Sequence, residues 1–63
     1  MSVGAELTAL SSTLEELTRR VTRMLAELNP ADEERYGTDL REVERTLGSA
    51  NRRLDRLVGA PRR

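Results

Sequence analysis

The chain lacks the residue types on which protein chemistry most often depends. Its 63 residues include no cysteine and no histidine. Without cysteine there are no disulfides or thiolate ligands, and a structural zinc site would need carboxylates alone. Without an imidazole, the serines have no base to activate them. We therefore expect a protein that is not an enzyme and that holds no metal and no cofactor.

Lysine is also missing, because all eleven basic residues are arginine, and Tyr36 is the only aromatic residue. The arginine preference has two interpretations: recognition of phosphate or carboxylate by the guanidinium fork, or the codon usage of a GC-rich genome. A single tyrosine leaves no aromatic platform on which unpaired bases could stack.

No run of apolar residues approaches the roughly 18 needed to span a bilayer. The first six residues do not have the basic flank and apolar run of a signal peptide. Eleven acidic residues balance the eleven arginines, so no net charge attracts the chain to nucleic acid or to a membrane. We expect a cytoplasmic protein with no membrane partner.

Apolar residues are present in a regular pattern, with alternating spacings of four and three in two segments. This is the a/d heptad pattern of helices that pack together, and it predicts helices over about residues 3 to 28 and 30 to 58. The first segment carries Val3, Leu7, Leu10, Leu14, Leu17, Val21, Met24 and Leu28, and the second carries Tyr36, Leu40, Val43, Leu47, Ala50, Leu54 and Leu57.

A stop and a restart separate the two segments at Asn29 and Pro30. Asn caps helices, Pro is favoured at the first helical position, and the acidic residues that follow suit the positive end of a helix dipole. Because so short a connection makes consecutive helices antiparallel neighbours, the sequence predicts an all-α, two-helix hairpin. Residues 1 to 58 form a single domain in this prediction, and residues 59 to 63 form a flexible tail.

Two glycines interrupt the second segment. Gly37 could end a short helical turn, with Asp39 capping the main helix, and Gly48 starts a run of small residues that would permit close packing of another helix or leave a gap for a ligand. The heptad phase continues through both glycines, which favours one helix bent at Gly37. Whether the helix breaks at either glycine stays open.

A hairpin of this size buries too little surface to be comfortably stable alone, and it has no disulfide or metal to compensate. Two copies would form a four-helix bundle with the heptad side chains, from Leu7 to Leu57, as both core and oligomer interface. Ser11, Thr18 and Leu25, on one shoulder of the first pattern, are small or apolar enough to accept a neighbouring helix.

Charge is distributed unevenly along the chain. Residues 27 to 44 contain seven acidic residues and two arginines, whereas residues 45 to 63 contain six arginines and one aspartate. An antiparallel homodimer would place each acidic turn beside the basic end of the other copy. The same distribution also suits the helix dipole within one chain, so both interpretations remain open.

The predicted function is that of a small interaction protein, a self-associating hairpin that acts as a protein-binding adaptor or regulator. The alternative is a nucleic-acid-binding regulator that uses arginine clusters, and an obligate heteromer with a different chain is a third possibility. Glu15, Glu16 and Asp55 dilute the positive field of these clusters. The candidate nucleic-acid-binding residues are Arg19, Arg20, Arg23, Arg52, Arg53 and Arg56.

Overall fold

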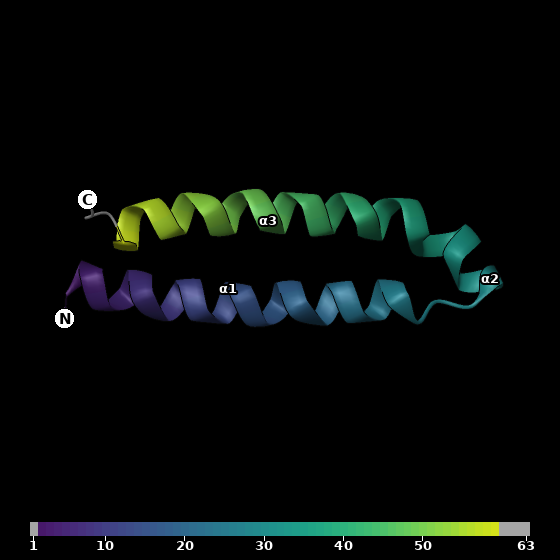
Figure 1. Ribbon diagram of the computed structural model, residues 1–63, viewed down its shortest axis with the longest axis horizontal. Helices are drawn as coiled ribbons and strands as arrows, with labels where there is room; N and C mark the ends of the chain where they lie inside the picture. Colours follow the sequence, from purple (N-terminus) through teal and green to yellow (C-terminus); the bar gives the residue numbers. More distant parts are fainter. Residues whose placement is uncertain (1, 60–63) are drawn as a thin grey trace.

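Two long helices lie side by side and run in opposite directions in the computed structural model, which describes residues 2–59 (Figure 1). They are α1 (Val3–Ala26) and α3 (Thr38–Gly59), and the connection contains α2 (Pro30–Asp32) and a π-helical turn, η1 (Glu33–Gly37). The molecule is a thin rod with extents of 45 × 22 × 14 Å. The predicted helical hairpin is confirmed.

A side-chain cap starts α1. Ser2 has extended backbone angles, and its Oγ accepts a hydrogen bond from the Ala5 N–H at 3.0 Å, which satisfies one of the free donors of the first turn. The helix ends at Ala26, two residues before the predicted end. The cause is Pro30, which restricts Asn29 to an extended conformation and forces the chain out of the helix beforehand.

The second helical segment starts at the predicted place. The Asn29 Oδ1 accepts a hydrogen bond from the Asp32 N–H at 2.8 Å, and Pro30 occupies the first helical position. Helical backbone then continues through α2, η1 and α3 without a break. The irregularity expected near Gly37 is therefore a π-helical turn, and the chain passes Gly48 inside a regular helix.

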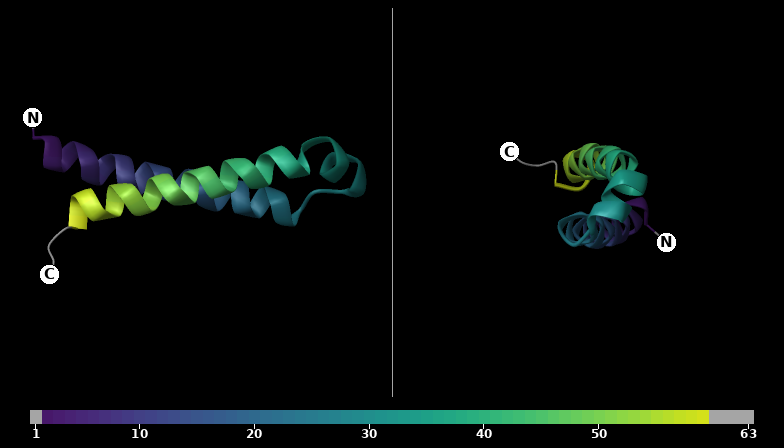
Figure 2. Two further views of the ribbon diagram at one scale, coloured as in Figure 1. Left: turned by 90° about the horizontal axis from the view of Figure 1, so that it is seen from above. Right: turned by 90° about the vertical axis from the view of Figure 1, so that its right-hand side faces the viewer.

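The long helices cross each other along the rod, so the hairpin is twisted (Figure 2). Of the predicted tail, only Gly59 lies within the described part of the chain, where it ends α3; residues 60–63 lie outside it. Among residues 2–59, no helix combines the length and apolar character required to cross a membrane.

Candidate interaction surface

The contact between α1 and α3 uses one row of each heptad pattern, and its side chains are only half-buried. Within residues 2–59, no apolar side chain is fully buried. The side chains that face the other helix at intermediate exposure are Leu7, Leu14, Val21, Leu25 and Leu28 from α1 and the turn, and Leu40, Leu47 and Leu54 from α3.

Polar side chains join the helices along one side of this contact. The Ser11 hydroxyl donates to the Asp55 carboxylate at 3.1 Å, and the Thr22 hydroxyl donates to Glu44 at 2.6 Å. Between these two pairs, the Asn51 Nδ2 donates to the Thr18 Oγ1 at 2.8 Å. We call these three pairs the polar seam.

Thr18 and Asn51 form the most enclosed pair of the polar seam. Thr18 Oγ1 accepts from Asn51 and donates its own hydrogen to the Leu14 carbonyl at 2.8 Å. The Asn51 Oδ1 is inaccessible to solvent and has no hydrogen-bond partner among the described residues. The pair is therefore satisfied on the amide nitrogen and unsatisfied on the amide oxygen.

The other side of the contact is apolar and exposed. Leu10, Leu17 and Met24 on α1 are 54%, 41% and 52% exposed, and Val43 and Leu57 on α3 are 44% and 62% exposed. Both groups repeat every seven residues, and Ala50 completes the row on α3 at intermediate exposure. We call these six residues the apolar face.

Helix geometry places the two rows of the apolar face on the same side of the hairpin. Each residue advances about 100° around a helix, so Leu10 lies about 60° to one side of Leu7 and Ser11 about 40° to the other. Val43 and Glu44 flank Leu40 in the same way on α3. Two antiparallel helices that face each other are related by a half-turn about an axis perpendicular to the apolar face. This half-turn exchanges the two helices but not the two sides of the hairpin. Both apolar rows therefore lie on one side of the hairpin, and the polar seam lies on the other.

The structure therefore divides the predicted core into two groups. Leu7, Leu14, Val21 and Leu28 face α3, whereas Leu10, Leu17 and Met24 are turned outward on the apolar face. Tyr36 is 48% exposed, and the Arg35 guanidinium lies 5.9 Å from its ring centroid. Sequence reasoning missed the partners Asn51 and Asp55, although the small groups at Ser11 and Thr18 were a signal that this shoulder faces α3.

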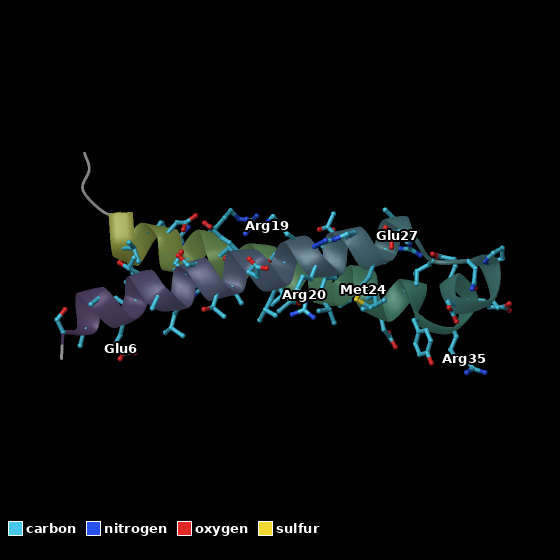
Figure 3. All side chains as sticks on the ribbon, turned by 90° about the horizontal axis from the view of Figure 1, so that it is seen from below. Glu6, Arg19, Arg20, Met24, Glu27 and Arg35 are labelled. Atoms are coloured by element: carbon cyan, nitrogen blue, oxygen red, sulfur yellow. The ribbon has the colours of Figure 1, made fainter. Side chains whose placement is uncertain are left out.

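The hairpin does not gather the six candidate nucleic-acid-binding arginines on one face. Arg20 projects to the same side of α1 as Met24, and Arg19 projects to the other side (Figure 3). Arg52 and Arg53 are consecutive and so point about 100° apart. Some of these arginines also have local partners, because Arg19 pairs with Glu16 at 3.3 Å and Arg52 donates to the Ser49 hydroxyl at 3.2 Å.

An ion pair joins the π-helical turn to α3. Arg41 donates two hydrogen bonds to the carboxylate of Glu33, and this carboxylate lies over Gly37. The hydrogen bond from Arg41 holds the pKa of Glu33 below its usual value of 4.5, opposed by desolvation and reinforced by the positive charge of Arg41. The same contact raises the pKa of Arg41. Because both side chains are about half exposed to solvent, the pair contributes little to stability.

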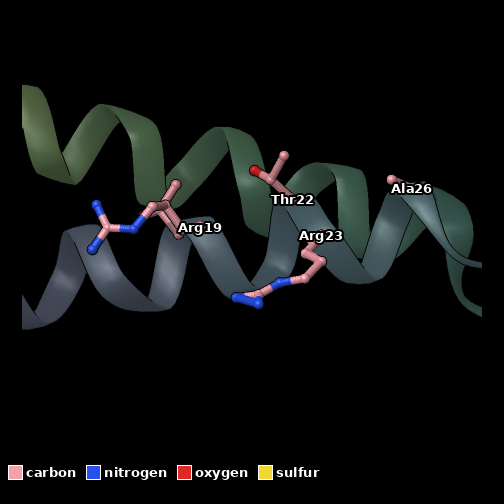
Figure 4. Close-up of a pocket in the computed structure, with 5 residues that line it drawn as sticks. Arg19, Thr22, Arg23 and Ala26 are labelled. Atoms are coloured by element: carbon pink, nitrogen blue, oxygen red, sulfur yellow. The ribbon is translucent and has the colours of Figure 1, made fainter.

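A shallow hollow of about 400 Å³ lies on the outside of α1 (Figure 4). Its walls are Thr18, Arg19, Thr22, Arg23 and Ala26. All five residues belong to one helix, so the hollow is open on the side away from α1 and does not enclose a ligand in the way that a binding pocket does.

Within residues 2–59, no three acidic side chains converge as metal ligands. In comparisons with known proteins, no family model, no curated protein and no solved structure matched the chain. The apolar face is thus the main feature of the described residues from which a function can be argued.

Proposed function

We propose that this chain is a non-enzymatic interaction protein, a helical hairpin that self-associates through its apolar face into a four-helix bundle and acts as a protein-binding adaptor or regulator. One observation carries the proposal. In the part of the chain that the structure describes, no apolar side chain is buried, whereas large apolar side chains are exposed along the whole hairpin.

Physical chemistry supports a covered apolar face. Burial of apolar surface is the main favourable term in folding, and the contact between α1 and α3 buries its side chains only in part. Contiguous exposed apolar surface on a soluble protein marks an interaction site. A rod 45 Å long and 22 Å wide offers on the order of 800 Å² to a partner, which is about the area that each partner contributes to a standard stable interface.

The absence of histidine and cysteine supports a role without catalysis, and the placement of the arginines favours protein over nucleic acid as the target. A nucleic-acid surface needs basic side chains aligned in a patch or stripe. Arg19 and Arg20 are consecutive and point about 100° apart, and Glu16 pairs with Arg19, which reduces the local positive charge.

A comparative capture experiment tests the proposed function. The tagged native chain, Leu17→Asp and the control Ser12→Asp are used as baits in an extract of the source organism, and the retained material is analysed by mass spectrometry and by absorbance at 260 nm. Ser12 is exposed on another face of α1. We expect the native chain and Ser12→Asp to retain the same protein partner and Leu17→Asp to lose it. Retention by all three baits, or salt-sensitive retention of nucleic acid alone, would contradict the proposal.

A further inference from the structure

We infer that a second copy of this chain packs on the apolar face and that the polar seam faces outward. In the orientation that we propose, which we call turn-to-ends, the turn of each copy lies at the end of the bundle where the other copy has its two chain ends, and α1 packs on α1 and α3 on α3. In the alternative, which we call same-way, both turns lie at the same end. This inference rests on the proposed self-association. It adds the face, the orientation and the register.

The two sides of the hairpin differ in what they can offer to a second copy. Along the polar seam, the hydroxyl groups of Ser11, Thr18 and Thr22 already donate hydrogen bonds to partners across the hairpin or within α1. The apolar face has no such partners, and its leucines and methionine are about half exposed. Burial of the apolar face therefore gains hydrophobic stabilisation without disturbing hydrogen bonds. Burial of the polar seam would not have this advantage.

The register follows from the heights of the two apolar rows along the rod. The row on α1 is centred on Leu17, and the row on α3 is centred on Ala50. Thr18 and Asn51, the residues next to these centres, are hydrogen-bonded to each other. Because the two helices are antiparallel and each residue advances about 1.5 Å, Leu17 and Ala50 lie within about 3 Å of the same height along the rod. A twofold axis at this height brings Leu17 to Leu17, Leu10 to Met24 and Val43 to Leu57 of the second copy.

The same axis brings Ala50 against Ala50 of the second copy. The methyl group of alanine lets two helices approach more closely than a larger side chain would, while the leucines and methionine fill the space on either side. The apolar face is thus self-complementary about this axis, as a twofold interface requires.

Charge selects between the two twofold arrangements. In both of them neighbouring helices are antiparallel, so helix direction does not separate the two. The turns do, because the segment from Glu27 to Gly37 contains four acidic residues and one arginine. The same-way arrangement places two of these segments side by side, whereas the turn-to-ends arrangement places them at opposite ends of the four-helix bundle.

Disulfide formation in single-cysteine variants of the full chain tests the orientation, because the chain has no other cysteine. Ala50→Cys places a thiol on the proposed twofold axis. The matched control Ser49→Cys places it one residue away, about 100° around α3 and exposed. Both variants are oxidised at a concentration where sedimentation shows the reduced proteins to be dimers, and covalent dimer is followed on non-reducing gels.

We expect Ala50→Cys to form covalent dimer on the order of 100-fold faster than Ser49→Cys, because proximity raises the effective thiol concentration. Leu17→Cys, at the same height on α1, provides a second variant that should also link to itself. A dimer in which neither variant links to itself, while a mixture of the two gives the mixed disulfide, would establish the same-way arrangement and overturn the inference. A chain that stays monomeric would instead overturn the self-association on which the inference rests.

Discussion

At the scale of single residues, the two glycines of the second helical segment have different surroundings. A Cβ added at Gly48 would have the Arg52 Nη1 at 3.7 Å as its nearest neighbour, which is an ordinary contact. A Cβ added at Gly37 would lie 2.6 Å from the Glu33 Cδ and would displace the carboxylate that pairs with Arg41. Gly37 is therefore adapted to its site, and nothing within the hairpin requires glycine at position 48.

We predict that Gly48→Ala stabilises the protein by about 1 kcal/mol, the difference in helix propensity between the two residues. Gly37→Ala is the matched comparison. We expect it to stabilise the protein less, because the added methyl group displaces the Glu33 carboxylate from its pair with Arg41. Urea unfolding at a fixed protein concentration measures both. Gly48 lies on the same side of α3 as Asp55 of the polar seam. Weaker self-association of Gly48→Ala would therefore mean that the second copy packs on the polar seam and not on the apolar face.

The pair between Glu33 and Arg41 predicts a pH dependence. Because the pKa of Glu33 is lower in the folded than in the unfolded protein, its contribution to stability is present above the unfolded pKa and is lost as the pH falls through the folded pKa. Glu33→Gln should therefore be slightly less stable than the native chain at pH 7 and equally stable at a pH below the folded pKa of Glu33, which lies under 4.5. Thermal unfolding of the two proteins at both pH values measures this, and a difference that persists unchanged in acid would refute the role of the ionised carboxylate.

At the scale of helices and turns, much of the fold could be predicted because each signal is local. The heptad spacing specifies two amphipathic helices, and Asn29 with Pro30 specifies a stop and a restart. Two features could not be predicted from these signals. The end of α1 depends on how far Pro30 acts backward along the chain, and the π-helical turn accommodates an extra residue near Gly37 that no spacing rule locates.

The periodicity also could not show which heptad row faces the other helix. Leu7 and Leu10 are equivalent members of an a/d pattern, and a hairpin that packs on only one other helix turns one of the two rows outward. The structure resolves this choice through the polar seam, whose hydrogen bonds fix how each helix is rotated about its axis. The candidate surface was thus present in the predicted core, but its division into two rows was not.

The polar seam should specify this rotation at a cost in stability. Thr18→Val removes the acceptor of the Asn51 Nδ2 and leaves the amide without a partner, so we predict a loss of about 1–3 kcal/mol. Thr18→Val with Asn51→Leu replaces the layer by apolar groups and should recover the native stability or exceed it. Urea unfolding of both single variants and the double variant completes the cycle. If the double variant were no more stable than Thr18→Val, the amide of Asn51 left without its partner would not be the source of the cost.

At the scale of the whole molecule, folding weakens the charge separation seen along the chain. Arg19, Arg20 and Arg23 lie in the half of α1 nearer the turn, so they fold back beside the acidic beginning of α3. The acidic segment from Glu27 to Gly37 extends beyond both of these regions at the end of the rod. The orientation of the dimer therefore depends on the acidic segment at the end of the rod. High salt screens charge, so it should reduce the preference for one orientation more than it reduces the burial of the apolar face.

Leu17→Asp separates a free hairpin from an assembled one. Leu17 is 41% exposed in the hairpin, so an aspartate there can keep its carboxylate in contact with water when the hairpin is alone. In the proposed dimer each copy of Leu17 buries only the surface that the hairpin leaves exposed, and an aspartate there would be buried without a partner, so association should weaken by at least roughly 10-fold. Ser12→Asp is the control for the effect of charge on helix α1. Equal dissociation constants for the two variants, measured by dilution, would show that Leu17 is not buried between copies.

Sedimentation equilibrium of the native chain across micromolar concentrations shows whether the hairpin covers its apolar face with a second copy of itself. We predict a mass that rises with concentration to twice the 7.1 kDa of the chain, together with a helical far-UV spectrum. A stably folded species that keeps the mass of a single chain over the whole range would contradict the account.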